Sequence, residues 1–417
     1  MRRNIFYGVL VFIILLLPFG INLFFPGNEG NVGGIQLEFI LFAFTLLGIA
    51  LFHEFTLYTA LAGLVSVILH KVIFQDFPIM EHLYSERIIL INLLGLLTGF
   101  ALMSGHFEES GVPDLIPGRL PGGWKGPFLL LLTVFLISIF LDNIAAALIG
   151  GTLAYIIFQR KVHVGYIVAI VAASNAGGAG SVVGDTTTTM MWIEGVPVVQ
   201  VLHAYIAAVP ALLIFGYFAA RQQSTLQPVS GEIRTGQPVN YRKIAVVGMT
   251  LAGAILANVY LRLPAAGIWA ALLLGALFTR TKWNVLPGAL RNSLFLLSLV
   301  FMASMMPVEK LPDASPETAL FLGVVSSVFD NIPLTKLALE QNHYDWGLLA
   351  YTVGFGGSMI WFGSSAGVAI TGILPQARSV GSWIKSGWHV VVAYLIGYLI
   401  LLVTLGWNPL EIHLSSG

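Results

Sequence analysis

Three aspartates lie in short polar motifs inside otherwise apolar stretches of the chain. Asp142 and Asp330 each begin an Asp-Asn-Ile motif, and Asp185 is followed directly by four threonines. An ionisable group in a membrane-spanning segment is energetically costly, so it marks a functional site by default. Carboxylate, amide and hydroxyl oxygens suit hard cations, whereas soft metals prefer thiolates, and the chain has no cysteine. The motifs therefore predict a site for a small hard cation.

The candidate metal-ion ligands form two sets, one in each half of the chain. The first set is Asp142, Asn143, Asn175, Asp185 and Thr186, and the second is Asp330, Asn331, Ser358, Ser364 and Ser365. These Asp-Asn pairs could instead simply cap short helices, which contributes about 1 kcal/mol. Because Asn or Ser would cap a helix without burying a charge, we expect ion binding in addition to capping. No cofactor is expected.

Two further features near these motifs have several interpretations. Ser138 and Ser326 each precede an Asp-Asn pair by four residues, and helix packing explains them as well as ion binding does. Lys336 lies one helical turn past the second pair. Its ammonium group could neutralise Asp330, take the place of a cation, or extend to the membrane surface, and the sequence leaves these three alternatives open. Among the acidic residues, only the three aspartates are expected deep in the membrane, with Glu194 near an outer end.

The composition supports a membrane setting for these motifs. Charged residues make up 10% of the 417 residues and apolar residues 57%, with a mean hydropathy of +0.86. Soluble proteins carry about 25% charged residues. The 20 basic residues only balance the 20 acidic ones, so there is no basic excess to bind a nucleic acid. We therefore predict an all-α polytopic membrane protein that lies in the lipid bilayer, and exclude a soluble enzyme.

The apolar stretches predict about 11 transmembrane helices, each needing about 20 apolar residues. Plain spans are expected near 5–25, 37–53, 55–74, 88–105, 198–220, 243–261, 264–279, 287–306 and 386–406. The first is expected to be an uncleaved span rather than a signal peptide. The stretches 164–194 and 346–374 are too long for one straight crossing and contain Gly-Gly pairs, which disfavour a continuous helix. We predict that both are broken helices at the midplane.

The distribution of basic residues predicts the topology. With the N-terminus in the cytoplasm, most Lys and Arg residues fall inside, as the positive-inside rule requires. This bias emerges only if 126–158 and 317–341 are re-entrant helical hairpins, the first open to the cytoplasm and the second to the outside. The predicted organisation is a first span and outer loop (1–36), a first repeat (37–220), a cytoplasmic linker (221–242), a second repeat (243–406) and a tail (407–417).

The two halves share motifs in the same order. The Asp-Asn-Ile motifs at Asp142 and Asp330 are 188 residues apart, and Gly177-Gly178 and Gly356-Gly357 are 179 residues apart. One repeat begins in the cytoplasm and the other begins outside, so they must have opposite orientations. Inverted repeats are typical of secondary transporters, whose site lies near the midplane at the repeat interface.

The motif residues resemble the signature of NhaD-type sodium/proton antiporters. The resemblance rests on Asn175-Ala-Gly-Gly with Gly184-Asp185-Thr-Thr, and on Asp330-Asn-Ile-Pro-Leu with Gly363-Ser-Ser-Ala-Gly. This family belongs to the ion transporter superfamily, together with arsenite permeases and di- and tricarboxylate carriers. The resemblance implies an extra first span, two inverted five-span repeats with one hairpin each, and a homodimer. It also marks the same ten candidate ligands.

The leading hypothesis is exchange of Na⁺ (or Li⁺) for H⁺ across the cytoplasmic (inner) membrane of a prokaryote. Burial disfavours the charged form of a carboxyl group, so a proton and a sodium ion could compete for the same oxygens. The alternative is a transporter of an anion, such as a di- or tricarboxylate or arsenite, and Lys336 is the residue that supports it. Three buried acids and no arginine in the core argue against an anion.

Overall fold

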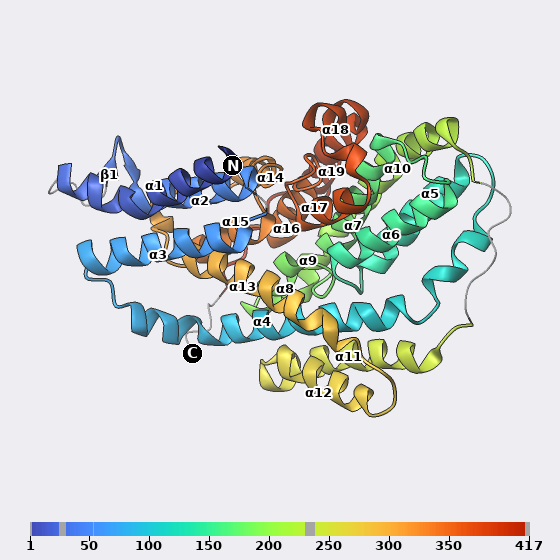
Figure 1. Cartoon of the computed structure of the whole chain (residues 1–417), viewed down its shortest axis with the longest axis horizontal. Coiled ribbons are helices and arrows are strands. Elements are labelled where there is room, and N and C mark those ends of the chain that lie inside the picture. Colours follow the sequence, from blue (N-terminus) through green and yellow to red (C-terminus); the bar gives the residue numbers. More distant parts are fainter. Residues whose placement is uncertain (1, 25–30, 53, 230–237, 413–417) are drawn as a thin grey trace.

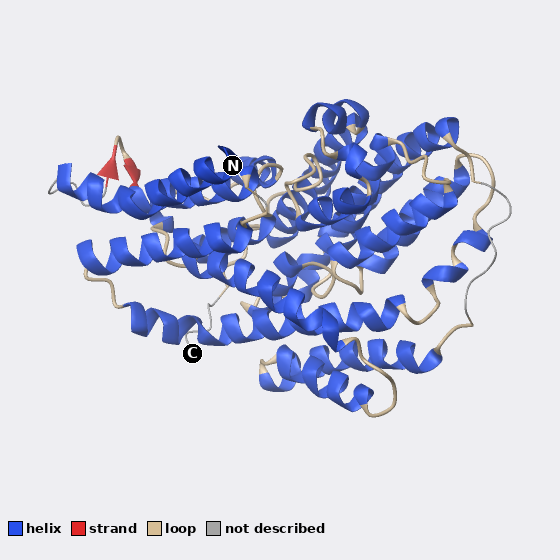
Figure 2. Ribbon diagram, viewed as in Figure 1, coloured by secondary structure: helices blue, strands red, loops and turns tan. Residues whose placement is uncertain are grey.

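The computed structural model describes residues 2–24, 31–52, 54–229 and 238–412, and helices dominate these residues (Figure 2). The first helices are α1 (Arg2–Phe24), α2 (Leu37–Leu51), α3 (Thr56–Phe74), α4 (Ile79–Glu108), α5 (Lys125–Ser138), α6 (Asn143–Ile157), α7 (Val164–Ala179), α8 (Thr186–Ile193), α9 (Val198–Leu202) and α10 (Ala204–Leu226). The remaining helices are α11 (Tyr241–Leu261), α12 (Pro264–Ala276), α13 (Leu286–Ala303), α14 (Pro316–Ser326), α15 (Asn331–Gln341), α16 (Trp346–Gly356), α17 (Ser365–Ile373), α18 (Val380–Ser386) and α19 (Trp388–Leu405).

The described strands, β1 (Asn31–Val32) and β2 (Ile35–Gln36), form one antiparallel pair between α1 and α2. Short 3-10 turns lie at Pro113–Leu115, Pro117–Arg119, Trp283–Val285, Val308–Lys310 and Pro375–Ala377. The predicted linker and tail include residues 230–237 and 413–417, which lie outside the described part of the chain.

Six helical segments in the described residues are long and apolar enough to cross a membrane. They are Thr56–Phe74, Ile79–Glu108, Val198–Leu226, Tyr241–Leu261, Trp283–Ala303 and Trp388–Leu405. Shorter apolar helices accompany them, including α2, α5, α6, α7, α12 and α14. These segments confirm a polytopic helical membrane protein, as the composition predicts.

Two predicted spans are longer in the structure because polar side chains at their ends are bonded within the protein. Helix α4 begins at Ile79 rather than near 88, and its Glu86 is buried in an ion pair described below. Helix α10 continues to Leu226 rather than ending near 220. Near its end, the Gln223 side chain accepts a hydrogen bond from the backbone N–H of His163 at 2.8 Å. The polar linker therefore begins several residues later than expected.

The helices form two groups. The first, which we call the frame helices, comprises α1 to α4 and α11 to α13, whose members pack mainly on one another. In Figure 1, α11 and α12 lie beneath α4. The second, the core helices, comprises α5 to α10 and α14 to α19, and it packs around α7 and α16. Residues Gly165–Ala179 of α7 and the whole of α16 are buried. The principal contacts between the groups are α13 with α15 and α4 with α8.

Each of the four motif-bearing segments forms two helices separated by a break. The breaks lie between α5 and α6, between α7 and α8, between α14 and α15, and between α16 and α17. Their second helices begin directly after Asp142, Asp185, Asp330 and Ser364, respectively. The segment pairs thus place four helix N-termini in the interior of the core group.

Corresponding residues of the two halves make corresponding contacts. The Ser138 hydroxyl donates to the carbonyl of Ser174 at 2.6 Å, and the Ser326 hydroxyl donates to the carbonyl of Val353 at 2.8 Å. These bonds tie α5 to α7 and α14 to α16. The two serines therefore pack helices, the first of the two interpretations that the sequence allows.

Two glycines allow α5 to pack closely on α7 and α14 to pack closely on α16. A Cβ on Gly177 would lie 2.2 Å from the carbonyl oxygen of Phe135, and one on Gly356 would lie 2.2 Å from that of Gly323. Real Cβ atoms do not approach backbone oxygen so closely, and a backbone cannot move aside as a flexible side chain can. Only glycine fits at these two positions.

We expect Gly356→Ala to destabilise the protein by about 1–3 kcal/mol, because overpacking forces the two backbones apart. The matched control is Gly248→Ala in α11, where a Cβ would meet no atom within 4 Å. The measurement is the thermal unfolding midpoint of the purified protein in detergent. Equal midpoints for the two variants would contradict the close contact between α14 and α16.

Candidate ion-binding site

The three motif aspartates are the N-caps of helices that begin inside the protein. Asp142 accepts a hydrogen bond from the backbone N–H of Ile144 at 3.2 Å, and Asp330 accepts one from that of Ile332 at 3.1 Å. Asp185 accepts one from the N–H of Thr187 at 3.1 Å. Capping therefore operates at all three positions. In each case it uses one carboxylate oxygen and leaves the other for a different partner.

Asp185 lies between the two Asp-Asn motifs. Its Oδ2 atom is 3.4 Å from the Asn143 amide nitrogen and 3.5 Å from that of Asn331. Both amides donate to the same carboxylate oxygen, and the distances are long for hydrogen bonds, so the contacts are weak. Asp185 is only 2% exposed. The structure thus brings Asn143 and Asn331, which are far apart in the sequence, to one buried carboxylate.

Asn175 extends this arrangement into the second broken helix. Its side-chain oxygen accepts from the Asn143 amide at 3.1 Å, and its own amide donates to Ser358 at 3.0 Å and to Ser364 at 3.2 Å. All of these side chains are at most 6% exposed. Asn175 therefore connects the first set of predicted ligands to the second in one polar network.

Two cavities adjoin the network. The first has a volume of about 350 Å³ and is lined by Asp142, Asn143, Asp185, Thr186 and Asn331, among others. It extends along α4 to Glu108, whose side chain is 43% exposed at the end of that helix. The ion-site residues thus have a path toward one end of α4.

The second cavity, of about 340 Å³, is lined by Asp330, Ser364 and Ser365. The Ser365 hydroxyl donates to Asp330 at 3.0 Å, and Ser365 also lines the first cavity. Eight of the ten predicted ligands thus line one of the two cavities. Asn175 donates a hydrogen bond to the cavity residue Ser364, and it donates another to Ser358, the tenth predicted ligand.

Asn292 of α13 is a lining residue that the sequence reasoning missed. It lies on both cavities, and it brings an amide side chain from a frame helix to their lining. A lone asparagine within the predicted span 287–306 was the available signal. It belongs to none of the repeated motifs, and for that reason it did not stand out.

The three aspartates have no cationic partner within the described residues. None of the ion pairs formed by Lys, Arg or His there involves Asp142, Asp185 or Asp330. Buried carboxylates without a paired cation are costly unless a proton or a metal ion neutralises them. The arrangement of carboxylate, amide and hydroxyl oxygens therefore suits a proton or a hard cation.

Lys336 takes none of the three roles that its sequence position suggested. Its Nζ atom lies 2.7 Å from Glu340, 2.8 Å from Glu194 and 3.0 Å from Glu86, and the residue is 1% exposed. It therefore neither neutralises Asp330, nor replaces a cation in the ion site, nor extends to the membrane surface. A helical pair four residues apart, Lys336 and Glu340, was visible in the sequence. The two distant partners were not.

That only three acids lie deep in the membrane stays a prediction, but burial inside the protein extends beyond Asp185. Glu38, Glu86 and Glu194 are also at most 9% exposed. Each of them lies within 4.0 Å of a lysine nitrogen. The buried acids of the described residues thus include three glutamates near a lysine, Asp185 beside the first cavity, and Asp345, which caps α16.

Comparison with known proteins places the chain in a family. The family model described as "Citrate transporter" (CitMHS) matches residues 39–356. Sodium/proton antiporter 1 of Arabidopsis thaliana is 28% identical over 337 residues, which are 68% of this chain and 56% of that protein. The Na(+)/H(+) antiporter NhaD of Alkalimonas amylolytica is 27% identical over 64% of this chain and 65% of its own length. That of Vibrio cholerae is 26% identical over 56% of this chain and 59% of its own length.

The match spans less than two thirds of the length of these relatives. The family model covers the first set of motif residues and Asp330 and Asn331 of the second, and it ends before Ser358, Ser364 and Ser365. The sequence motifs and the comparisons agree: the chain belongs to the citrate transporter family of the ion transporter superfamily, and it is similar to antiporters of the NhaD type.

Proposed function

We propose that the protein exchanges Na⁺ (or Li⁺) for H⁺ across a membrane by alternating access. The observation that carries this proposal is the Asp185 carboxylate. It is buried, it has no cationic partner among the described residues, and it lies on a cavity between Asn143 and Asn331. The relatives named as sodium/proton antiporters support the same cargo.

Exchange follows from competition for the same oxygens. A proton on Asp185 removes the charge that attracts Na⁺, and bound Na⁺ raises the cost of adding a proton. An empty site with charged carboxylates is expensive to move through a low-dielectric interior, whereas a site that holds a proton or a sodium ion is less so. The protein therefore changes state with one cargo or the other, which couples the two fluxes.

The proposed sodium ligands are the oxygen atoms of the residues around the two cavities. Asp142, Asp185 and Thr186 supply carboxylate and hydroxyl oxygens to the first, and Asp330, Ser364 and Ser365 supply them to the second. Asn143, Asn175, Asn331 and Ser358 orient these groups through the hydrogen bonds described above. The weak bonds of Asn143 and Asn331 to Asp185 leave that carboxylate free to bind an ion.

Two inverted repeats with re-entrant hairpins provide the proposed moving part. The equivalent serine bonds and glycine contacts of the two halves support this symmetry. Transporters of this kind rock one part of the molecule around a fixed site. We propose that the core helices move against the frame helices, in a homodimer in the inner membrane of a prokaryote, with the N-terminus in the cytoplasm.

The structure weakens the alternative of anion transport. That alternative depended on Lys336 as a cationic group at the site, and Lys336 is instead engaged by three glutamates. An anion would also meet three aspartates. The family model is named for citrate, so citrate and succinate are the anions to test as alternative cargo.

We expect Asp185→Asn to abolish sodium-dependent proton flux in proteoliposomes, measured with a pH-sensitive dye trapped in the lumen. Asparagine keeps the oxygen that caps α8 but loses the charge that binds the ion. The matched control is Asp345→Asn, a buried aspartate that caps α16 outside the cavities. It should retain flux. Full activity in Asp185→Asn would refute the assignment, and uptake of labelled citrate or succinate by the parent would favour the alternative.

We expect Na⁺ to stabilise the folded protein, since it binds only the native site. The gain is about 2.7 kcal/mol at a free concentration about 100 times Kd. It should shrink as the pH falls, because protons compete for the same carboxylates, and it should be absent from Asp185→Asn. The measurement is the thermal unfolding midpoint with NaCl against choline chloride at equal ionic strength. A sodium-dependent gain that grows in acid would contradict competition.

A further inference from the structure

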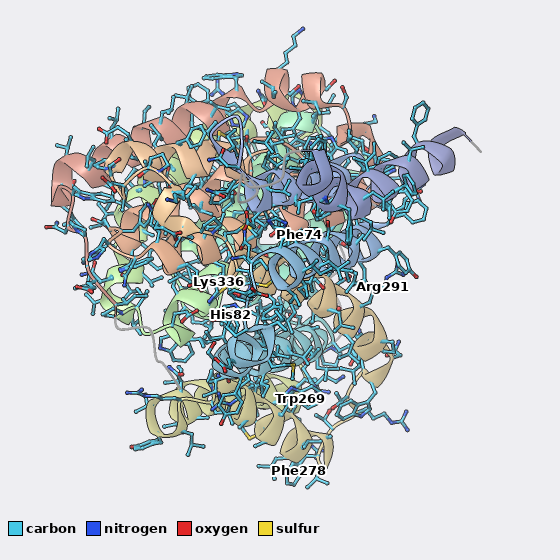
Figure 3. The ribbon with its side chains drawn as sticks, turned by 90° about the vertical axis from the view of Figure 1, so that its left-hand side faces the viewer. Phe74, His82, Trp269, Phe278, Arg291 and Lys336 are labelled. Atoms are coloured by element: carbon cyan, nitrogen blue, oxygen red, sulfur yellow. The ribbon has the colours of Figure 1, made fainter. Side chains whose placement is uncertain are left out.

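A second group of buried charges lies away from the ion site. We call Lys336, Glu340, Glu194 and Glu86 the Lys336 cluster. The lysine nitrogen is within 3.0 Å of a carboxylate oxygen from each glutamate. In Figure 3, which views the molecule from the left-hand side of Figure 1, Lys336 lies next to His82 of α4. None of its four residues lines either cavity of the ion site.

The cluster joins the two helix groups. Lys336 and Glu340 belong to α15, and Glu194 follows the last residue of α8, so all three move with the core helices. Glu86 belongs to α4, a frame helix. The ion pair between Lys336 and Glu86 is therefore a direct charged contact between the parts that the proposed function requires to move.

The cluster is also connected to the ion site through short helices. Helix α8 begins after Asp185 and ends before Glu194, and α15 begins at Asn331 and carries Lys336. The two helices contact each other. At a helical rise of 1.5 Å per residue, Glu194 lies only about 14 Å from Asp185 along the axis of α8. A displacement of the ion site therefore displaces the cluster as well.

The cluster and the open cavity lie toward opposite ends of α4. The first cavity touches that helix from Leu97 to Glu108. Glu86 lies about 16 Å before Leu97 along the helix, outside the cavity lining. In this structure the cavity of the ion site thus extends toward the Glu108 end of α4, and the charged contact lies toward the other end of that helix.

Burial makes this contact strong, and it also indicates which partner separates. The side chains of Lys336 and Glu194 are 1% and 2% exposed, and that of Glu86 is 12% exposed. Ion pairs attract more strongly away from water, but a buried charge left alone is costly. If Glu86 separates, Lys336 keeps Glu194 and Glu340 as partners. Of the two glutamates that reach the lysine from outside its own helix, Glu86 is more exposed than Glu194 and regains water at the lower cost.

We infer that the Lys336 cluster stabilises the state open toward the Glu108 end, and that the ion pair between Glu86 and Lys336 breaks when the protein opens to the other side. This inference depends on alternating access in the proposed function, but not on which ion is carried. Weakening the ion pair shifts the population toward the opposite state. The cluster thereby sets the balance between the two states without contacting the cargo.

The absence of native cysteine allows a direct test. Leu148→Cys on α6 places a thiol in the lining of the first cavity. A membrane-impermeant maleimide is applied from each side of reconstituted vesicles. The rate at which it reacts with this thiol reports the fraction of molecules in which the cavity is open to that side. We expect the added change Glu86→Gln to slow labelling from the Glu108 side by about fivefold or more, because a population shift reduces the open state. The matched control is Glu81→Gln, an exposed glutamate on the same helix.

Glu86→Asp is the second variant, since it keeps the charge but shortens the side chain. It should slow labelling less than Glu86→Gln and fold if the glutamine variant does not. Labelling rates equal to those of the control in both variants would overturn the inference. If labelling slows but the parent shows no sodium-dependent proton flux, the inference stands and the proposed cargo is wrong. If flux is present but labelling is unchanged, the cargo stands and the inference fails.

Discussion

The burial of an unpaired carboxylate at Asp185 is the constraint on which the rest of the site depends. Such a group needs hydrogen-bond donors from the protein, and the described structure supplies them from a helix N-terminus and from the amides of Asn143 and Asn331. Helix N-termini exist inside the protein only where helices are interrupted. The breaks in four segments therefore follow from the same electrostatic requirement that makes the site suitable for an ion.

Interrupted helices need unusually close support, because their ends expose backbone groups that lipid cannot bond. The structure meets this need with glycine and serine. Gly177 and Gly356 let a helix approach the carbonyl oxygen of its neighbour, and Ser138 and Ser326 donate to carbonyls of α7 and α16. The contacts are the same in both halves. The same kind of helix contact thus supports the motif residues in each half of the chain.

The protein uses buried charge in two different ways. The aspartates of the cavities have no lysine or arginine partner among the described residues, so their charge is available to a mobile ion. The glutamates around Lys336 are paired by the protein itself, and one of them belongs to a different helix group. In our proposal the first arrangement binds the cargo and the second holds the two helix groups together. None of the residues of the Lys336 cluster lines the two cavities.

The sequence by itself determined the class of protein and the helix breaks, and it predicts oxygen ligands for a hard cation. These follow from local properties: apolar length, glycine density, and carboxylates beside amides and hydroxyls. It did not determine which of the distant residues contact one another in the folded protein. Only the folded chain joins Asn175 to Ser358 and Ser364, and brings Glu86 and Glu194 to Lys336. A charge pattern along the chain shows where a charged group is costly. Its partner, often more than a hundred residues away, is chosen by helix packing, and no local pattern encodes that choice.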